Sequence, residues 1–169
     1  MKTKIEKSIF KNIADIHICR IDCTPKIITK LLEMFTLSKK VEMIVSINFE
    51  ENQSLPIGKI EAFSSKYETS FLEGEHNNGM FNLMVLPWEY ENALSDIFDF
   101  EVENIAIYSV NGESELAKDL SYNMSRKLVV QKKLNLFITV MVAEEKIAIS
   151  LNKEAFDVSK VVARIKELF

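Results

Sequence analysis

Apolar residues recur along the chain with the two periods that distinguish strands from helices. From Val41 to Phe49 every second residue is apolar, which predicts a strand with one buried face. The residues predicted to point outward from this strand are Glu42, Ser46, Asn48 and Glu50. Over Ile13–Cys23 apolar residues occupy both parities, as in a strand buried on both faces. The pattern therefore predicts two strands in the first third of the chain.

A hairpin is predicted in the middle of the chain. Asn78-Gly79 lies between the apolar-rich arms Thr69–Glu75 and Met80–Leu86, and an Asn-Gly pair supplies the positive φ angles of a tight turn. A second hairpin is predicted near the C-terminus, with Glu144-Glu145 between its arms. The arms of that second hairpin, and two further short strands, are predicted over Leu134–Ala143, Lys146–Leu151, Lys59–Ser64 and Ile105–Val110.

Helices are predicted where apolar residues return every three or four positions. Thr24-Pro25 marks the start of the clearest helix, because a hydroxyl caps a helix and proline suits its first turn. A second helix follows Pro87, a third follows Asn111-Gly112, and the last begins near Asn152 or Lys153. The apolar faces are formed by Ile27, Ile28, Leu31, Leu32 and Phe35; by Tyr90, Ala93, Leu94, Ile97 and Phe98; by Leu116, Leu120 and Met124; and by Phe156, Val161, Val162, Ile165 and Leu168.

The predicted order of elements is β-α-β-β-β-β-α-β-α-β-β-α. Hairpins outnumber β-helix-β crossovers in this order, so we expect a mostly antiparallel or mixed β-sheet with about four helices packed on it. This arrangement belongs to the α+β class. No repeat, low-complexity segment or linker interrupts the 169 residues, and we expect a single α+β domain over residues 1–169.

The composition excludes several classes of protein. The net charge is only −4 and 47% of the residues are hydrophobic, which is not the composition of a disordered chain. No apolar run approaches the roughly 20 residues of a membrane helix, and no secretory signal is visible. Two cysteines, Cys19 and Cys23, fit a reducing compartment, so a cytoplasmic location without membrane contact is expected. The excess of lysine over arginine is typical of an AT-rich bacterial or phage genome.

Known catalytic and nucleotide-binding signatures are missing from the sequence. Its four glycines form neither GxGxxG nor GxxxxGK[ST], and GxSxG and HExxH are also absent. The segment His17-x-Cys19-x-x-x-Cys23 has the residue types of a metal site, but on a strand Cys19 and Cys23 lie about 13 Å apart, too far to share one zinc ion. We therefore expect no metal, no cofactor and no catalytic residue, and structural packing for both cysteines.

Charge is distributed unevenly along the chain. Between Lys66 and Lys118 the sequence contains no lysine or arginine but 11 acidic residues. Such a tract repels nucleic acid and attracts a basic surface, and aromatic residues inside a charged rim are typical of protein-binding hot spots. The residues predicted to bind a partner are Glu73, Glu75, Trp88, Glu89, Tyr90, Glu91, Asp96 and Asp99.

The acidic tract also has a purely structural interpretation. Its carboxylates would then form ion pairs with lysines elsewhere in the fold, and Trp88 would pack in the core. The lysines considered for this pairing are Lys118, Lys132, Lys133, Lys160 and Lys166.

Three hypotheses for function follow from the sequence. The first is a small protein-binding domain, not an enzyme, whose acidic middle segment docks a basic protein partner, as an immunity protein or inhibitor does to a toxin or nuclease. The second is a homodimeric chaperone or regulatory subunit. The third is an enzyme that uses His17 and Cys19 with the nearby Asp15 and Asp22.

Overall fold

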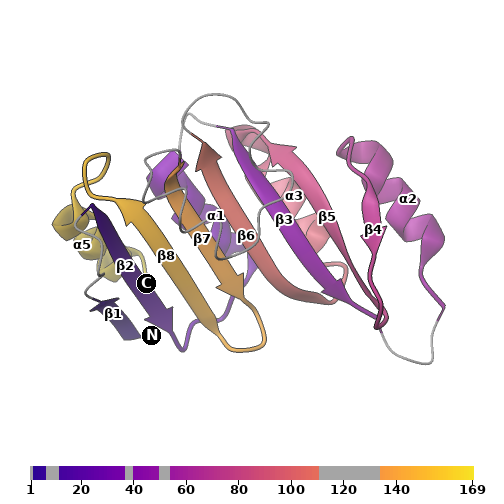
Figure 1. Cartoon of the computed structure of the whole chain (residues 1–169), viewed down its shortest axis with the longest axis horizontal. Coiled ribbons are helices and arrows are strands. Elements are labelled where there is room, and N and C mark those ends of the chain that lie inside the picture. Colours follow the sequence, from indigo (N-terminus) through magenta and orange to yellow (C-terminus); the bar gives the residue numbers. More distant parts are fainter. Residues whose placement is uncertain (1, 7–11, 37–39, 50–53, 111–133) are drawn as a thin grey trace.

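A single antiparallel sheet forms the centre of the molecule. The computed structural model describes residues 2–6, 12–36, 40–49, 54–110 and 134–169. In this part of the chain eight strands are hydrogen-bonded in the order β1-β2-β8-β7-β6-β3-β5-β4 (Figure 1), and every neighbouring pair is antiparallel. The strands are β1 (Lys2–Glu6), β2 (Ile13–Cys19), β3 (Val41–Asn48), β4 (Phe71–Glu73), β5 (Asn78–Val85), β6 (Val102–Val110), β7 (Leu134–Met141) and β8 (Lys146–Asn152).

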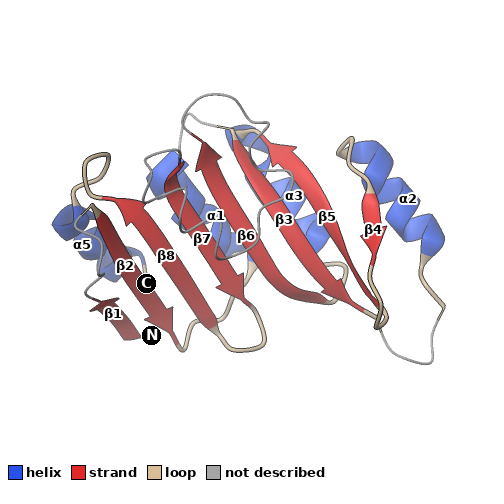
Figure 2. Cartoon of the chain, in the orientation of Figure 1, coloured by secondary structure: helices blue, strands red, loops and turns tan. Residues whose placement is uncertain are grey.

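Helices cover one face of this sheet, which gives the two-layer α+β architecture that the sequence predicts (Figure 2). Helix α1 packs against α3 and touches α5, while α2 lies beside β4 at the end of the sheet (Figure 1). None of the helices in the described residues is long and apolar enough to cross a membrane. The helices are α1 (Pro25–Thr36), α2 (Ile57–Lys66), α3 (Tyr90–Ile97) and α5 (Val158–Leu168), and a short 3-10 turn, η1 (Pro87–Glu89), precedes α3.

The core lies between the helices and the sheet, and strand alternation determines which residues enter it. On β3 the odd-numbered residues Val41, Met43, Val45 and Ile47 are buried, as the period of two predicts. Equivalent positions on the neighbouring strands and one face of each helix complete the core. These include Ile16, Ile18, Ile28, Leu31, Leu32, Phe81, Leu83, Leu94, Ile97, Ile105, Ile107, Ile138, Ile149 and Ile165.

Local sequence signals position α1 and α3 as expected. The Thr24 hydroxyl accepts a hydrogen bond from the Ile27 amide at 3.3 Å, and Pro25 opens α1. Helix α3 follows Pro87, and Tyr90, Ala93, Leu94 and Ile97 form its buried side. The last helix begins later than predicted, at Val158, because Asp157 is its N-cap and accepts from the Lys160 amide.

The second face of the sheet carries a row of buried side chains across its central strands. Glu42 lies on this face, opposite the core residues of β3, as the alternation predicts, but its side chain is only 4% exposed. Tyr108 and Phe137 stack beside it with ring centroids 5.1 Å apart, and both are buried. Farther along the face, the buried Ser150 hydroxyl donates to Asp15 at 2.7 Å. Alternation alone predicts the face on which a residue lies, but it does not predict whether that face is exposed to solvent.

Both predicted hairpins form, but the first turn differs from the prediction. The turn lies at residues 74–77 with a positive φ at Asn77, and Asn78-Gly79 already belongs to β5. Gly79 is needed for space: a Cβ there would lie 2.0 Å from Cζ of Phe71, the ring that covers it. In the second hairpin β7 and β8 are joined as expected, with a positive φ at Glu145.

Three other boundaries differ from the sequence prediction. The segment Lys59–Ser64, predicted as a strand, lies within α2, because Ile60, Phe63 and Tyr67 recur at helical spacing and pack inward. Strand β1 was not predicted, and β2 ends at Cys19 because Arg20 adopts a positive φ. The predicted helix around residues 116–124 lies outside the described residues.

Candidate functional site

The predicted partner-binding residues lie at the end of the sheet formed by α2, β4, β5, η1 and α3. We call this part, residues 54–101, the acidic end. It contains nine carboxylates and two lysines, Lys59 and Lys66. The acidic tract of the sequence is therefore one region of the fold at least as far as residue 101. Glu113 and Glu115, at the far end of the tract, lie outside the described residues.

Trp88 lies in η1 and is 76% exposed, the most exposed of the large apolar side chains in the described residues. Pro87 at the start of this turn and the Glu89 carboxylate, which accepts from the Leu86 amide at 3.0 Å, set the backbone here. The interpretation that packs Trp88 in the core is therefore wrong. One carboxylate oxygen of Glu89 is used in this hydrogen bond within the turn, whereas Glu91, two residues farther on, is exposed.

Tyr90 does not belong to the surface. Its side chain is fully buried beneath α3, with no exposed area. A side chain in this position contributes to the core and is not available to a partner, so the prediction that Tyr90 contacts a partner is corrected. The reason is the helical period: Tyr90, Ala93 and Ile97 share the face that meets the sheet.

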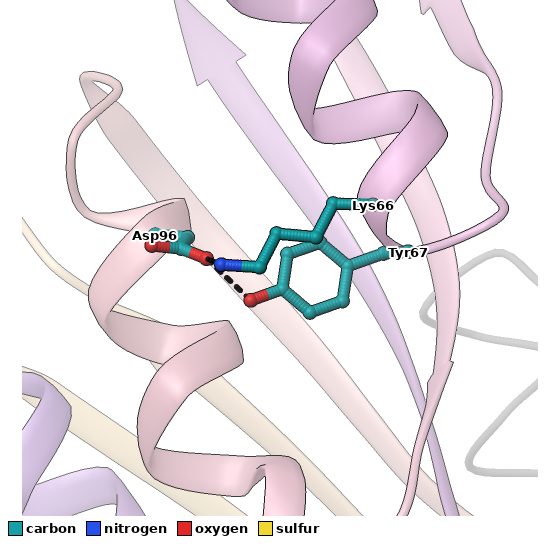
Figure 3. A network of polar contacts seen from close by, with 3 residues as sticks. All are labelled: Lys66, Tyr67 and Asp96. Carbon is teal, nitrogen blue, oxygen red and sulfur yellow. Dashed lines mark hydrogen bonds and ion pairs between the residues drawn. The ribbon is translucent and has the colours of Figure 1, made fainter.

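Asp96 joins α3 to α2 through a compact polar network (Figure 3). Its Oδ2 accepts from Lys66 Nζ at 2.7 Å and from the Tyr67 hydroxyl. Hydrogen bonds from Lys66 and Tyr67 lower the pKa of the Asp96 carboxyl. Burial, reinforced by the hydrogen bond to Asp96, raises the pKa of the Tyr67 hydroxyl. Asp96 is thus ion-paired, as the structural interpretation of the tract expects, but with a lysine that was not considered.

Asp99 interacts with α2 in a different way. Lys59 Nζ donates to its backbone carbonyl oxygen and also lies 4.4 Å from the centroid of the Phe100 ring. The Asp99 carboxylate itself is not used in this contact, and the residue is exposed. Both lysines of the acidic end are consequently directed toward the α3 side of α2.

Glu73 and Glu75 lie at the other end of β5 from Trp88. Glu73 ends β4, Glu75 is in the following turn, and both are exposed. Strand β5 begins just after that turn and runs for eight residues before η1, a length of about 25 Å. The predicted partner-binding residues are therefore divided between at least two separate areas of the acidic end. A partner that contacts both areas at once needs an extended interface.

Exposed apolar side chains accompany these carboxylates. In the described residues the five large hydrophobic side chains that are exposed all belong to the acidic end: Ile57, Leu72, Met80, Met84 and Trp88. Leu72 and Met80 are opposite one another in the β4–β5 register. Ile57, Leu72 and the two methionines could not be recognised from the sequence, because a β4 of three residues carries little periodicity and the segment of α2 was predicted as a strand.

A groove separates α2 from β4 in the same region. Its volume is about 560 Å³, and its apolar lining consists of Leu55, Ile57, Ile60 and Phe71. The polar side chains along it are Glu61, Ser64, Ser65 and Glu73, with no basic residue among them. The volume is in the range of roughly 300–1,000 Å³ that is typical of ligand sites.

Three of the four residues considered for enzyme chemistry lie on β2, and the fourth, Asp22, lies beyond its end. Asp15, His17 and Cys19 share one side of β2, but Cys23 lies beyond its end, where its thiol donates to the Ile21 carbonyl oxygen at 3.6 Å. Burial, with the nearby carboxylates Asp22 and Glu145, raises the pKa of Cys23 to about 11. In the part of the chain that the structure describes, no three His, Cys, Asp or Glu side chains are grouped to hold a metal ion.

Comparisons with known proteins leave the family open. No family model matches the chain, and no curated protein matches it. Solved structures with some likeness are the aspartokinase alpha and beta subunits (9% identity, TM-score 0.27, 75% of this chain and 93% of that one) and the aspartate kinase of Clostridium acetobutylicum (15%, 0.28, 98% and 36%). The regulatory subunit of aspartate kinase from Thermus thermophilus is similar at 12% identity and a TM-score of 0.28, over 78% of this chain and 93% of that one.

Proposed function

We propose that the chain is a protein-binding domain whose acidic end captures a basic protein partner, in the manner of an inhibitor or immunity protein that neutralises a toxin or nuclease. One observation carries the proposal: the exposed large apolar side chains of the described residues all belong to the acidic end, which also carries nine carboxylates and only two lysines. An acidic surface that only faces solvent requires the charged side chains but not the exposed apolar ones. Apolar side chains within a charged rim are typical of protein interfaces.

Each kind of side chain has its own part in this mechanism. The carboxylates raise a negative potential that speeds the approach of a basic partner and disfavours acidic ones. Trp88 and the exposed apolar residues of β4 and β5 supply area that leaves water on binding and slows dissociation. Among the predicted residues, Glu73, Glu75, Glu91 and Asp99 have exposed carboxylates available for this purpose, whereas Asp96 already binds Lys66.

Affinity capture tests the proposal directly. The protein is immobilised, exposed to a lysate of its source organism at about 50 mM and about 500 mM salt, and the bound proteins are identified by mass spectrometry. The dissociation constant is then measured with the purified candidate. We expect a basic protein that binds at low salt and is released at high salt.

Matched variants assign the binding to the acidic end. Neutralising Glu73, Glu75 and Glu91 to glutamine should weaken the complex and flatten its salt dependence. A control triple, Glu33→Gln, Glu144→Gln and Glu145→Gln, makes the same charge change at exposed positions elsewhere and should bind as wild type. Equal loss in both triples, or capture of no basic protein at either salt concentration, contradicts the proposal.

Trp88→Ala provides an uncharged test of the same surface. Since the side chain is 76% exposed, its removal should change the free energy of unfolding by no more than about 0.5 kcal/mol. A central contact residue nevertheless contributes about 2 kcal/mol or more to binding. We expect a clear loss of affinity, measured by calorimetry, together with an unchanged urea midpoint; unchanged affinity would remove Trp88 from the interface.

A further inference from the structure

Strand β4 is an edge strand with hydrogen-bonding groups that face the groove. In the described part of the chain it pairs with β5 alone, and α2 lies beyond it (Figure 1). The register pairs Leu72 with Met80, and the Gly74 amide donates to the Asn78 carbonyl oxygen at 2.8 Å. Because antiparallel strands alternate between inward and outward residues, Leu72 bonds toward β5, and the N–H and C=O groups of Phe71 and Glu73 point away from it.

The same two residues line the groove. Phe71 and Glu73 form its β4 side, and Ile57, Ile60 and Glu61 are among the residues of its α2 side. An extended peptide that paired with the outer edge of β4 would therefore lie in the groove. Its side chains on the α2 side would meet an apolar lining and two carboxylates.

The charges of the groove indicate what kind of peptide fits. Neither Glu61 nor Glu73 has an ion-pair partner in the described residues, and both side chains are exposed. The lysines of α2 are directed to Asp96 and to the Asp99 carbonyl oxygen. A second copy of this chain, paired edge to edge through β4, would bring the same carboxylates together, and like charges on facing strands repel. A basic segment is complementary to the groove.

We infer that the groove between α2 and β4 binds an extended segment of the partner as an added antiparallel strand, with an apolar side chain on Phe71 and a basic side chain at Glu73 and Glu61. This inference rests on the proposed function, which it deepens by giving the partner's binding segment a conformation and a sequence pattern. Apolar and basic residues two positions apart in that segment face the α2 side together.

A blocked peptide that repeats Val-Thr-Lys-Thr is the probe for this site. Its valine and lysine side chains share one face, and in antiparallel pairing the N–H groups of the residues opposite Phe71 and Glu73 point at β4. The same peptide N-methylated at every valine and lysine cannot make these bonds, whereas N-methylation of the threonines leaves them intact. Binding is measured by calorimetry and by hydrogen exchange of the Phe71 and Glu73 amides.

We expect the unmodified and threonine-methylated peptides to bind and to protect both amides. The valine- and lysine-methylated peptide should bind about tenfold more weakly or worse. A Val-Thr-Glu-Thr peptide should not bind. If methylation at valine and lysine has no effect, or if the two amides remain unprotected when the basic peptide is bound, the added strand is disproved.

Variants of Glu73 test the same geometry from the protein side. Glu73→Pro removes the outward N–H together with the charge, and proline is tolerated on an edge strand where the lost N–H faces outward. Glu73→Gln removes only the charge. Glu73→Pro should weaken peptide binding about tenfold beyond Glu73→Gln. Exchange of the Leu72 and Met80 amides in the free variant shows whether β4 itself is still paired; if it is not, the methylated peptides decide the question.

The remaining outcomes separate this inference from the function on which it rests. Salt-dependent binding of a basic protein that Glu73→Pro weakens no more than Glu73→Gln does disproves the groove but leaves the proposed function standing. Binding of neither the basic peptide nor any basic protein contradicts the proposed function. Light scattering that finds a dimer of the wild type and a monomer of Glu73→Pro assigns the β4 edge to a second copy and overturns the inference.

Discussion

Trp88 and Tyr90 are separated by one residue, yet one is exposed and the other is completely buried. Both are aromatic residues with Glu89 as a neighbour, so the charge pattern of the acidic tract does not show which of them is exposed. The helical period does, because Tyr90 stands four residues before Leu94 and seven before Ile97 on the buried side of α3. Trp88 lies before the helix begins, and its position could be determined only from the turn that Glu89 stabilises.

At the scale of residues, Asp96 and Asp99 should behave differently when neutralised. Asp96→Asn removes the ion pair with Lys66 and weakens the hydrogen bond from Tyr67, which should cost about 1 kcal/mol of unfolding free energy at neutral pH. Asp99→Asn is the matched control, because Lys59 contacts only its backbone carbonyl. Urea unfolding of both variants measures the difference, and equal stability would contradict the network.

The same network predicts a dependence on pH. The pKa of Asp96 is lowered in the folded protein from its ordinary value of 3.8, so its carboxylate adds stability above that pH. This contribution is lost as the pH falls below 3.8 and through the folded pKa. The difference in unfolding free energy between wild type and Asp96→Asn should therefore be largest at pH 7. It should shrink toward zero once the pH falls below the folded pKa of Asp96. A difference that grows on acidification would be inconsistent with the lowered pKa.

Cys19 and Cys23 offer a chemical test of burial. Cys23 is buried with its pKa raised from 9.0 to about 11, so near neutral pH its thiolate fraction falls by about a hundredfold. Alkylation of Cys23 by iodoacetamide at pH 8 should be slower in the folded protein than in urea by at least that factor. Mass spectrometry of Cys19→Ser protein follows this thiol alone. Equal rates in the folded and unfolded protein would show that Cys23 is accessible.

At the scale of elements, strong periodicity predicted the fold and short segments were misread. Strand β3 and helix α3 have several apolar positions each at one period, and both form where expected. Helix α2 was assigned as a strand because a six-residue window shows too few turns to separate the two periods. Its buried face becomes clear only when Tyr67, after the helix, is included. The groove beside α2 could not be predicted either, because a groove forms between elements and has no local sequence signal.

Gly79 and Gly58 should respond in opposite ways to an added methyl group. Gly79→Ala places a Cβ against the Phe71 ring and 2.8 Å from the Leu72 carbonyl oxygen, which should destabilise the protein by about 1–3 kcal/mol. Gly58→Ala in α2 meets nothing within 4 Å and should stabilise it by up to about 1 kcal/mol. Urea unfolding compares the two. A harmless Gly79→Ala would mean that Phe71 is free to move aside, and the groove would then be adaptable.

At the scale of the whole molecule, net charge conceals how the charge is distributed. The chain carries −4, but the acidic end alone carries −7 from nine carboxylates and two lysines. This imbalance is visible in the sequence because it is a property of a long segment. The division of the predicted residues into separate areas could not be predicted, since it follows from the length of β5: Glu73 of β4 pairs near its start, and Trp88 of η1 follows its end.

Self-repulsion within the acidic end makes the stability depend on salt. Screening of like charges should raise the melting temperature of the free protein by about 2–4 °C between low and moderate salt, equivalent to about 1 kcal/mol. Differential scanning calorimetry measures the shift, with sodium chloride as the screening salt. A melting temperature that falls with salt would mean that ion pairs such as Lys66–Asp96 outweigh the repulsion.

The strand order has a consequence for the protein as it emerges from the ribosome. Strand β2 pairs with β8, and Ile13 faces Asn152 across 139 residues of sequence. At a synthesis rate of about 5–20 residues per second, β2 waits roughly 7–28 s for this partner. Strand β1 is its neighbour in sequence and can cover one edge at once, so a single open edge beside Ile16 and Ile18 remains during translation. The nascent chain is most vulnerable to wrong pairing at that edge until the last quarter of the sequence has been made.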